Sequence, residues 1–271
     1  MADTEDPSAD SATPGPVVVA RRVLLTGGTS GLGLAMASAL AHAGASVVLT
    51  GREASRAEAV AAGLRNATGL GASGLGLDTR DEASVHAAVS AAMDRLGGID
   101  LLINNAGLGM RTVNPRFHTD PQGFWTVAPD GFRAVVDTNL TGYFLVAREV
   151  TPLMLAAGHG RIVNISMNHT TMVRRGFVPY GPSRAGAEAL SRIMAADLDG
   201  TGVTVNLLLP GGATRTGMLP PGAEVRPGVL EPEIMGPPIV WLASAAADGV
   251  TNERIVATEF TDWLRQRALP R

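Results

Sequence analysis

Short apolar runs of strand length alternate with longer helical patterns along most of this chain. The runs that are typical of strands are residues 17–26, 46–50, 74–77, 99–104, 160–166, 203–209 and 253–258. The helical patterns begin near Gly31, Ser55, Glu82, Pro129, Tyr180 and Met235. Such alternation is typical of a parallel sheet with helices on both faces. We therefore predict an α/β protein with a single-domain, doubly wound Rossmann fold around a seven-stranded parallel sheet.

The remaining segments set the expected domain limits. Residues 1–20 are acidic and rich in proline, serine and alanine, which favours a disordered tail. Residues 21–271 are expected to form one domain, because a chain of this length often folds as a single unit. Two long segments, 108–128 and 214–236, fit neither a strand nor a helix. Both would follow strands at the carboxyl edge of the sheet, where open α/β sheets bind ligands, so we expect them to be substrate loops.

Composition excludes several classes of protein. The chain contains no cysteine, so disulfides, thiolate metal sites and cysteine nucleophiles are excluded. No group of histidines and carboxylates has metal-ligand spacing, and no metal is expected. The net charge of −3 and the scattered charges argue against a nucleic-acid partner. No apolar run reaches the ~18–20 residues that span a bilayer, and the start lacks a signal-peptide pattern, so we expect a cytoplasmic protein that binds a small molecule.

The segment after the first expected strand has the pattern of a phosphate-binding turn. It reads Thr-Gly-Gly-Thr-Ser-Gly-Leu-Gly over residues 26–33 and leads into an alanine-rich helix. Glycines allow a tight turn and let backbone N–H groups approach a pyrophosphate, while the helix N-terminus favours the anion. A glycine-rich turn without a ligand is the alternative, because a short glycine motif alone is a weak signal. The contacts expected with a dinucleotide come from Gly27, Thr29, Ser30, Gly31, Leu32 and Gly33.

The end of the second expected strand indicates which dinucleotide binds. A site for NAD usually has an acidic residue there, which holds the ribose 2′-hydroxyl. This chain has Gly51 followed by Arg52, and an arginine can pair with a 2′-phosphate. A solvated surface arginine is the alternative. The sequence therefore favours NADP(H) over NAD(H) as cofactor.

Between about residues 22 and 255, further motifs resemble in order and spacing those of the orthodox-size short-chain dehydrogenase/reductase (SDR) family. They are Leu77-Asp78, the Asn-Asn-Ala-Gly run 104–107, the segment 137–142 with Asn139, the Tyr-Gly-Pro-Ser-Arg-Ala run 180–185, and Pro210-Gly211. The resemblance implies an NAD(P)-dependent oxidoreductase that is a homodimer or homotetramer. It also implies that the cofactor contacts Asp78, Asn105, Ala106, Gly107, Pro210 and Gly211.

The resemblance assigns the chemistry to a tyrosine, a lysine and a serine. Tyr180 would be the general acid or base, and Asn139 would hold a water of the proton relay. Free tyrosine titrates near pH ~10, so it needs a nearby cation to work around neutrality. Arg184 stands where the family has lysine, four residues on and hence on the same helix face. A guanidinium can bind the cofactor ribose, but it cannot pass a proton along a relay.

Position 167 is the sharper departure, because the family has its catalytic serine there and this chain has Met167. A thioether cannot donate a hydrogen bond to a carbonyl oxygen. Losing one such donor typically costs ~3–4 kcal/mol of transition-state stabilisation. Three explanations stay open: Ser166 takes over through a local bulge, Asn168 or His169 is the donor, or the substrate needs no such donor.

These departures leave three hypotheses for function. The first is a reductase that transfers hydride from NAD(P)H to the carbonyl group of a small or medium apolar substrate. The second is an imine reductase, in which Met167 and Arg184 are adaptations to a C=N group that already carries its positive charge. Against it, Arg184 would add a second positive charge nearby. The third is a protein that binds NADP(H) without turnover, as a sensor or an assembly partner.

Several loop and terminal residues have less specific interpretations. The aromatic residues Phe117, Phe124, Trp125 and Phe177 are expected to line an apolar pocket, with loop anchoring or subunit contact as alternatives. His118 is more typical of a surface residue than of a proton donor. Residues 259–265 are expected to form a short helix with an apolar face, and the small residues 185–187 to permit close approach of a second subunit.

Overall fold

Seven parallel strands form one sheet in a computed structural model that describes residues 22–220, 222 and 227–268. The expected tail, residues 17–21 of the first expected strand, and part of the segment 214–236 lie outside the described residues. The strand order is β3-β2-β1-β4-β5-β6-β7, as expected for a doubly wound sheet. The strands are β1 (Arg22–Leu25), β2 (Ser46–Gly51), β3 (Ala72–Gly76), β4 (Leu101–Asn104), β5 (Gly160–Ile165), β6 (Val203–Leu209) and β7 (Arg254–Val256).

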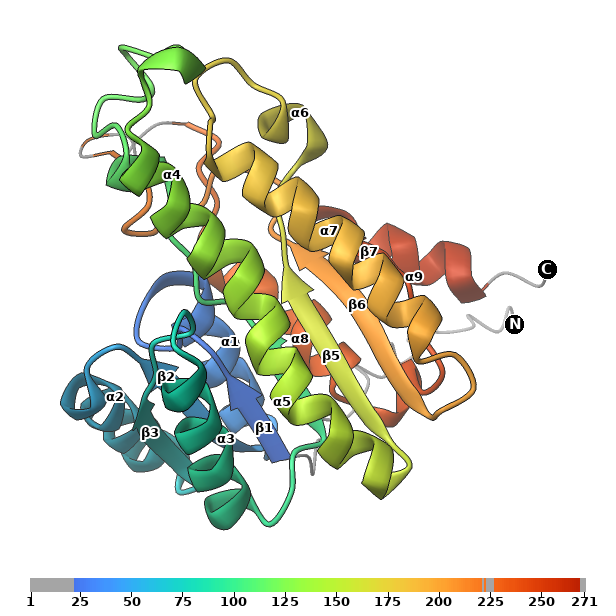
Figure 1. The fold of residues 1–271 in the computed structure, drawn as a ribbon. Helices are drawn as coiled ribbons and strands as arrows, with labels where there is room; N and C mark the ends of the chain where they lie inside the picture. The colour runs from blue at the N-terminus through green and yellow to red at the C-terminus, as the bar shows by residue number, and fades with distance from the viewer. Residues whose placement is uncertain (1–21, 221, 223–226, 269–271) are drawn as a thin grey trace, which may run out of the picture.

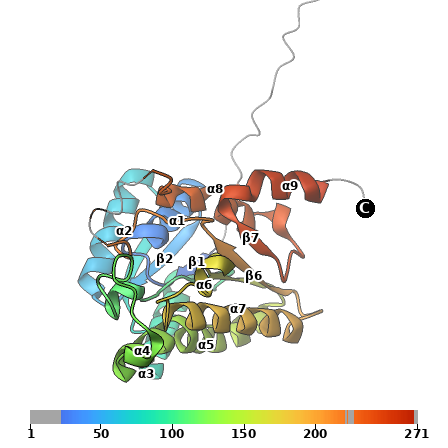
Figure 2. The same ribbon diagram turned by 90° about the horizontal axis from the view of Figure 1, so that it is seen from above.

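Helices cover both faces of the sheet (Figures 1 and 2). On one face lie α1 (Gly31–His42), α2 (Ala54–Thr68), α8 (Gly236–Leu242) and α9 (Phe260–Ala268). On the other lie α3 (Glu82–Leu96), α5 (Gly142–Ala157) and α7 (Tyr180–Asp197), with α4 (Pro129–Val136) leading into α5. The predicted fold class is therefore confirmed.

The apolar runs of the sequence correspond to strands that are buried on both faces. In β1, Val23 and Leu25 pack into the core beneath α1 and α8, whereas Leu24 between them packs into the core beneath α3 and α5. All three side chains are fully buried. Because neighbouring residues of a strand point to opposite faces, a strand covered on both sides has consecutive apolar positions.

The structure departs from the sequence-based boundaries at several places. The helical pattern that begins at Pro129 continues through a π-helical turn, Asp137–Thr141, into α5. A short helix, α6 (His169–Met172), follows β5, where the sequence patterns predicted no helix. The last strand is shorter than predicted, because residues 257–259 form a 3-10 turn. The short helix expected at 259–265 is present as α9.

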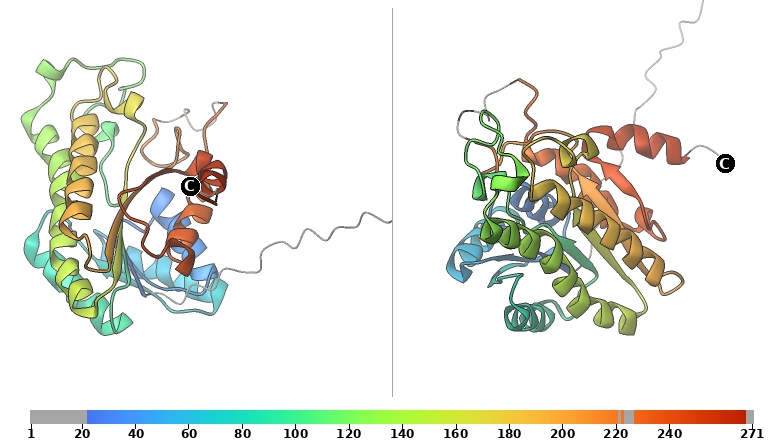
Figure 3. Two further views of the ribbon diagram at one scale, coloured as in Figure 1. Left: turned by 90° about the vertical axis from the view of Figure 1, so that its right-hand side faces the viewer. Right: turned by 45° about the horizontal axis from the view of Figure 1, so that its top comes forward.

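The loop 108–128 and the described part of 214–236 lie at the end of the molecule where α6 is found (Figure 3). The loop 108–128 holds two single 3-10 turns, Met110–Thr112 and Phe124–Thr126. A third turn, Pro232–Met235, closes the described part of 214–236. The Arg111 guanidinium joins the two loops by donating to the carbonyl oxygens of Gly217 (2.8 Å) and Leu219 (3.2 Å).

Candidate active site

A cavity of about 770 Å³ opens along the carboxyl edge of the sheet, between the strand ends and the two loops. Ser166 and Met167 line it, whereas Asn139 is fully buried beside it. The cavity also brings together every residue expected to contact a dinucleotide: Gly27, Thr29, Ser30, Gly31, Leu32, Gly33, Arg52, Asp78, Asn105, Ala106, Gly107, Tyr180, Arg184, Pro210 and Gly211.

The turn between β1 and α1 has a backbone suited to a pyrophosphate. Gly27 and Gly31 have φ of +67° and +53°, a region that residues with a side chain rarely adopt. A Cβ at Gly33 would lie 2.2 Å from the Gly27 carbonyl oxygen, so only glycine allows this packing of turn and helix. Ser30, the N-cap of α1, makes no side-chain cap hydrogen bond. The first N–H groups of α1 would hold the phosphates of a dinucleotide.

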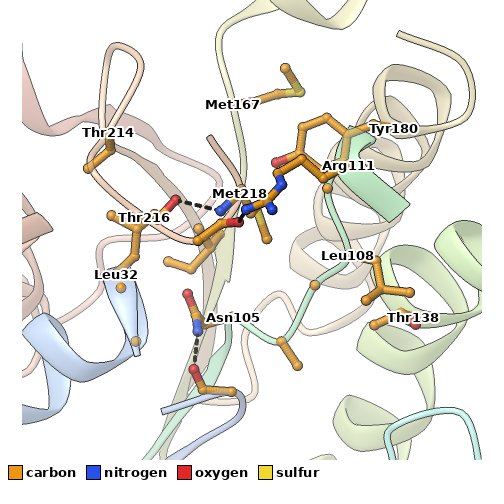
Figure 4. Close-up of a pocket in the computed structure, with 18 of the residues that line it drawn as sticks. Leu32, Asn105, Leu108, Arg111, Thr138, Met167, Tyr180, Thr214, Thr216 and Met218 are labelled. Atoms are coloured by element: carbon orange, nitrogen blue, oxygen red, sulfur yellow. Dashed lines mark hydrogen bonds between the residues drawn. The ribbon is translucent and has the colours of Figure 1, made fainter. Parts of the chain in front are cut away.

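Asn105 fixes this turn against the end of β4. Its Nδ2 donates to the carbonyl oxygens of Thr26 (3.0 Å) and Gly27 (2.8 Å), as Figure 4 shows in part. The N–H groups of Asn105 and Ala106 donate to Thr26 Oγ1 at 3.0 and 3.1 Å. Both amide hydrogens of Asn105 are thus engaged by the turn, so Asn105 shapes the phosphate site through the backbone that it holds.

The opposite end of the cavity, beyond β2 and β3, is basic. Arg52 and Arg56 line it and are exposed. Asp78 is bound by Arg80 through two hydrogen bonds, Nε to Oδ1 (2.9 Å) and a terminal guanidinium nitrogen to Oδ2 (2.6 Å). These bonds to Arg80, with the charge of Arg52 nearby, hold the pKa of Asp78 below its ordinary value. The carboxylate of Asp78 is therefore already bound by Arg80. The expected contact of Asp78 with adenine stays a prediction.

A buried cation lies beside Tyr180 at the start of α7. Arg184 is 3% exposed, and its Cζ lies 5.4 Å from the ring centroids of both Tyr180 and Tyr143. One guanidinium nitrogen donates to the Tyr143 hydroxyl (2.6 Å) and to the Ile165 carbonyl oxygen (2.9 Å), while Nε has no hydrogen-bond partner. Burial opposes the charge of Arg184, but its interactions with the two tyrosines raise its pKa above the ordinary value. The cation next to Tyr180 is therefore permanent.

Asn139 ties the loop after β4 to α7 from the π-helical turn. Its Oδ1 accepts from the Leu108 N–H (2.8 Å), and its Nδ2 donates to the Leu108 carbonyl oxygen (2.9 Å) and to Ser183 Oγ (3.1 Å). Both amide hydrogens of Asn139 and one of the two acceptor positions of its Oδ1 are thus engaged within the protein. Its role in holding a relay water stays a prediction.

The position of the family's catalytic serine is apolar in this protein. Met167 is 9% exposed and belongs to a cluster of buried residues with Met110, Phe117, Met172 and Phe177. Figure 4 shows Met167 next to the Tyr180 ring at the cavity wall. No hydrogen bond can come from this side chain to a substrate oxygen.

The three residues considered as substitute donors are all engaged elsewhere. Ser166 continues the ladder of β5, since its N–H donates to the Leu208 carbonyl oxygen (2.9 Å), so there is no bulge that brings it to the place of Met167. Its Oγ donates to Glu188 (2.5 Å). Asn168 Nδ2 donates to the Gly211 carbonyl oxygen (2.8 Å), and His169 Nε2 lies 3.0 Å from Glu188.

Glu188 organises the segment that carries Met167. Arg254 binds the Glu188 carboxylate (3.0 Å) and also donates to the Met167 carbonyl oxygen (2.7 Å). Burial opposes ionisation of Glu188, but hydrogen bonds from Ser166 and His169 and the charge of Arg254 hold its pKa below the ordinary value. The backbone after β5 is therefore fixed by an ionised carboxylate two helical turns beyond Tyr180.

The loop aromatics separate into two groups. Phe117 and Phe177 line the cavity with ring centroids 5.7 Å apart, and His118 lines it as well. Phe124 and Trp125 are 70% and 77% exposed and do not line it. The pocket interpretation therefore fits the first pair, whereas the second pair lies on the surface.

Sequence reasoning missed two residues that shape the site, Tyr143 and Glu188. Burial raises the pKa of Tyr143, so its hydroxyl stays protonated and donates to Ile165 (3.3 Å) while it accepts from Arg184. No spacing rule connects Tyr143 with Arg184. Glu188 did leave a signal, because it follows Tyr180 and Arg184 at the same four-residue interval on one helix face.

The sheet topology and the glycine turn are those of a dinucleotide-binding α/β protein, and Tyr180 lines the same cavity. Residues 21–224 match the family model described as short chain dehydrogenase. The chain is 35% identical over 188 residues to a 3-oxoacyl-[acyl-carrier-protein] reductase of Aquifex aeolicus, covering 69% of this chain and 72% of that protein. It is 34% identical over 190 residues to a gluconate 5-dehydrogenase of Gluconobacter oxydans, covering 70% of each.

A solved structure gives the same result. The 3-ketoacyl-(acyl-carrier-protein) reductase of Brucella melitensis, in complex with NADH, superposes with a TM-score of 0.75 at 28% identity, over 86% of this chain and 95% of that one. This chain belongs to the short-chain dehydrogenase/reductase family. Among its described residues, no helix is long and apolar enough to cross a membrane, and no three His, Asp or Glu side chains could hold a metal ion together.

Proposed function

We propose that the protein is an NADPH-dependent reductase of a carbonyl group in a small or medium apolar substrate, with Tyr180 as general acid. The observation that carries this proposal is the position of Tyr180, which lines the same cavity as the phosphate turn and has the buried Arg184 cation beside its ring. A bound nicotinamide would supply the hydride. Tyr180 would donate a proton to the substrate oxygen, and the positive charge of Arg184 favours the charge that Tyr180 keeps after donation.

The residues at the cavity ends divide the task of holding the cofactor. The first turn of α1 and the glycines before it would hold the pyrophosphate. Pro210 and Gly211 line the cavity beyond β6 and would contact the nicotinamide half of the cofactor. Arg52 and Arg56, which the described structure places in no ion pair, support a preference for the 2′-phosphate of NADP(H). We expect this preference to reach about 10- to 100-fold in KM, as for a hydrogen bond to a charged group.

The imine reductase hypothesis has support from one residue and opposition from two features. Met167 favours it, because a protonated imine needs no hydrogen-bond donor. Against it, the charged residues described in the cavity wall are almost all arginines, which repel a cationic substrate. In addition, the replacement of the family's lysine by Arg184 is not specific to this site, since the chain contains no lysine and all 22 of its basic residues other than histidine are arginines. Arg184 therefore gives no separate support to an adaptation for imines. The carbonyl reductase is the better-supported function.

A protein that binds NADP(H) without turnover is the third candidate. The engagement of Ser166, Asn168 and His169 favours it, because each of these side chains is held by another residue. Tyr180 and the adjacent Arg184 cation argue against it, since binding of NADP(H) without turnover does not require a general acid in the cavity. This hypothesis predicts NADPH binding with no oxidation of NADPH by any carbonyl compound.

We further propose that the protein is a cytoplasmic homo-oligomer. Phe144 on α5 and Ile193 on α7 are 45% and 58% exposed, so apolar side chains are available for a subunit contact on these helices. Of the small residues 185–187, Gly186 and Ala187 pack against their own chain. A Cβ at Gly186 would lie 2.9 Å from Leu140 of the same chain, and Ala187 is buried.

The test is NADPH oxidation by the purified protein with a panel of ketones, aldehydes and cyclic imines, with NADH in parallel. Ketone turnover that is lost in Tyr180→Phe supports the proposed function. Turnover of imines alone supports the second hypothesis. No turnover, with NADPH still bound in a fluorescence titration, supports the third.

A further inference from the structure

The substrate side of the cavity carries positive charge without an acidic residue to balance it. Among the described residues that line the cavity, Asp78 is the one carboxylate, and Arg80 binds it at the adenine end. Arg111 and Arg174 line the cavity between the two substrate loops and α6. An anion that enters here meets attraction from both arginines, and no described carboxylate lines this part of the cavity.

Arg174 is held in place by a tight turn. The Phe177 N–H donates to the Arg174 carbonyl oxygen (3.2 Å), and Gly176 has a φ of +78°, as a turn of this kind requires. A Cβ at Gly176 would lie 2.7 Å from Pro121 Cβ, so the turn packs directly against the loop 108–128. The position of Arg174 is therefore set by packed backbone on both sides.

The guanidinium of Arg174 is presented to solvent at an aromatic surface. Its Cζ lies 5.5 Å from the Phe177 ring centroid, and the side chain is exposed. Within the described part of the chain, no carboxylate forms an ion pair with it. An arginine that is fixed over a ring and keeps its hydrogen-bond donors free is suited to bind an anionic group of a ligand.

The surface next to Arg174 is apolar and polarisable. Phe177 and Phe117 meet edge to face, and Met110 and Met167 pack in the same cluster, all four lining the cavity. Thioether and aromatic side chains contact flat, unsaturated groups favourably. The cavity thus offers an apolar surface beside Tyr180 and a cation beyond it.

We propose that the substrate is an amphiphile, whose unsaturated or aromatic body lies on the surface of Met110, Phe117, Met167 and Phe177 and whose anionic group, a carboxylate or a phosphate, binds Arg174. This inference rests on the proposed function, because the same cavity receives the reacting carbonyl group. It adds the charge of the substrate and names Arg174 as the residue that selects it.

The experiment compares pairs of ketones that differ in one charge. The first set contains aryl keto acids of increasing chain length, and each acid is paired with its own methyl ester. The second pair is a 3-ketoacyl thioester of phosphopantetheine and that of pantetheine, which separates a phosphate source from a carboxylate source. Each ligand is tested for KM and, independently of turnover, for its dissociation constant with the protein–NADP⁺ complex. The variants are Arg174→Gln and, as a matched control, Arg175→Gln. The control removes the same charge from the neighbouring residue, which is exposed and does not line the cavity.

We expect the anionic member of one pair to bind about ten-fold more tightly than the neutral member, and Arg174→Gln, but not Arg175→Gln, to abolish that ratio. Equal binding of the two members in both pairs would overturn the proposal, as would an equal loss in both variants. Absence of turnover with anion-selective binding intact would contradict the proposed function while it supports the anion site, so the two failures are distinguishable.

Discussion

Replacing Met167 by serine tests how this protein stabilises a substrate oxygen. The backbone at position 167 is fixed, because Arg254 binds the Met167 carbonyl oxygen and Asn168 is tied to Gly211. A serine there would stand on the same backbone at the cavity wall, next to Tyr180. If its hydroxyl reaches the oxygen of a reacting ketone, the donor is worth about 3–4 kcal/mol in the transition state, or roughly 10²- to 10³-fold in kcat.

The same substitution has a cost in folding. Met167 is 9% exposed and packs with four other buried apolar residues, so its loss removes buried thioether and methylene surface. We expect the free energy of unfolding to fall by about 2–5 kcal/mol, the range for large-to-small changes of buried methionine. The gain in catalysis is of similar size but appears in a different measurement, so the two effects can be separated.

The assay is kcat and KM for NADPH oxidation with one ketone and one cyclic imine, together with urea unfolding. Met172→Ser is the matched control, because Met172 belongs to the same cluster but does not line the cavity. We expect Met167→Ser to raise the ratio of ketone to imine turnover, and Met172→Ser to lower stability without changing that ratio. A ratio that Met167→Ser leaves unchanged, or that both variants change alike, would refute the reasoning.

Three further predictions follow from the contacts described. Arg52→Gln should lower the preference for NADPH over NADH by about 10- to 100-fold in KM, and an unchanged preference would assign the 2′-phosphate to another residue. Tyr143→Phe removes the hydroxyl that receives Arg184 at 2.6 Å; we expect kcat to fall about ten-fold and the KM for NADPH to change less, since Tyr143 does not line the cavity. Glu188→Gln should lower the free energy of unfolding by about 3 kcal/mol near neutral pH, because it leaves the part-buried Arg254 without its counter-charge. The pKa of Glu188 is lower in the folded than in the unfolded protein, so its ionisation stabilises the fold above the unfolded-state pKa, and this stability is lost as the pH falls through the folded-state pKa. The difference in unfolding free energy between wild type and Glu188→Gln should therefore shrink in acid. A difference that urea unfolding shows to be independent of pH would contradict this.

The sequence predicts the sheet well because its signals are local. The apolar runs 46–50 and 203–209 match β2 and β6 within one residue, since each is buried on both faces and bounded by turn residues. Position 167 can be located by counting back from Tyr180 and forward along the apolar run 160–166, because both counts end at the same residue.

Contacts between distant elements are what the sequence does not predict. The engagement of Ser166 by Glu188 decides that this serine is no substitute for Met167, and it depends on how α7 packs against the end of β5. The pairing of Tyr143 with Arg184 likewise depends on the packing of α5 against α7. The π-helical turn at Asp137–Thr141 was not predicted either, because Asp, Thr and Asn disfavour a helix interior but are equally typical of caps and ordinary turns.

The guanidinium beside Tyr180 has a consequence for the range of compounds that the protein can tolerate. An ε-amine near a reacting aldehyde or ketone can condense with it to a Schiff base, and a thiolate can add to an electrophile. Arg184 does neither, and the rest of the chain contains no lysine and no cysteine. Electrophilic carbonyl compounds can therefore occupy this site without covalent capture by an amine or thiol side chain. We expect such substrates not to inactivate the protein by that route.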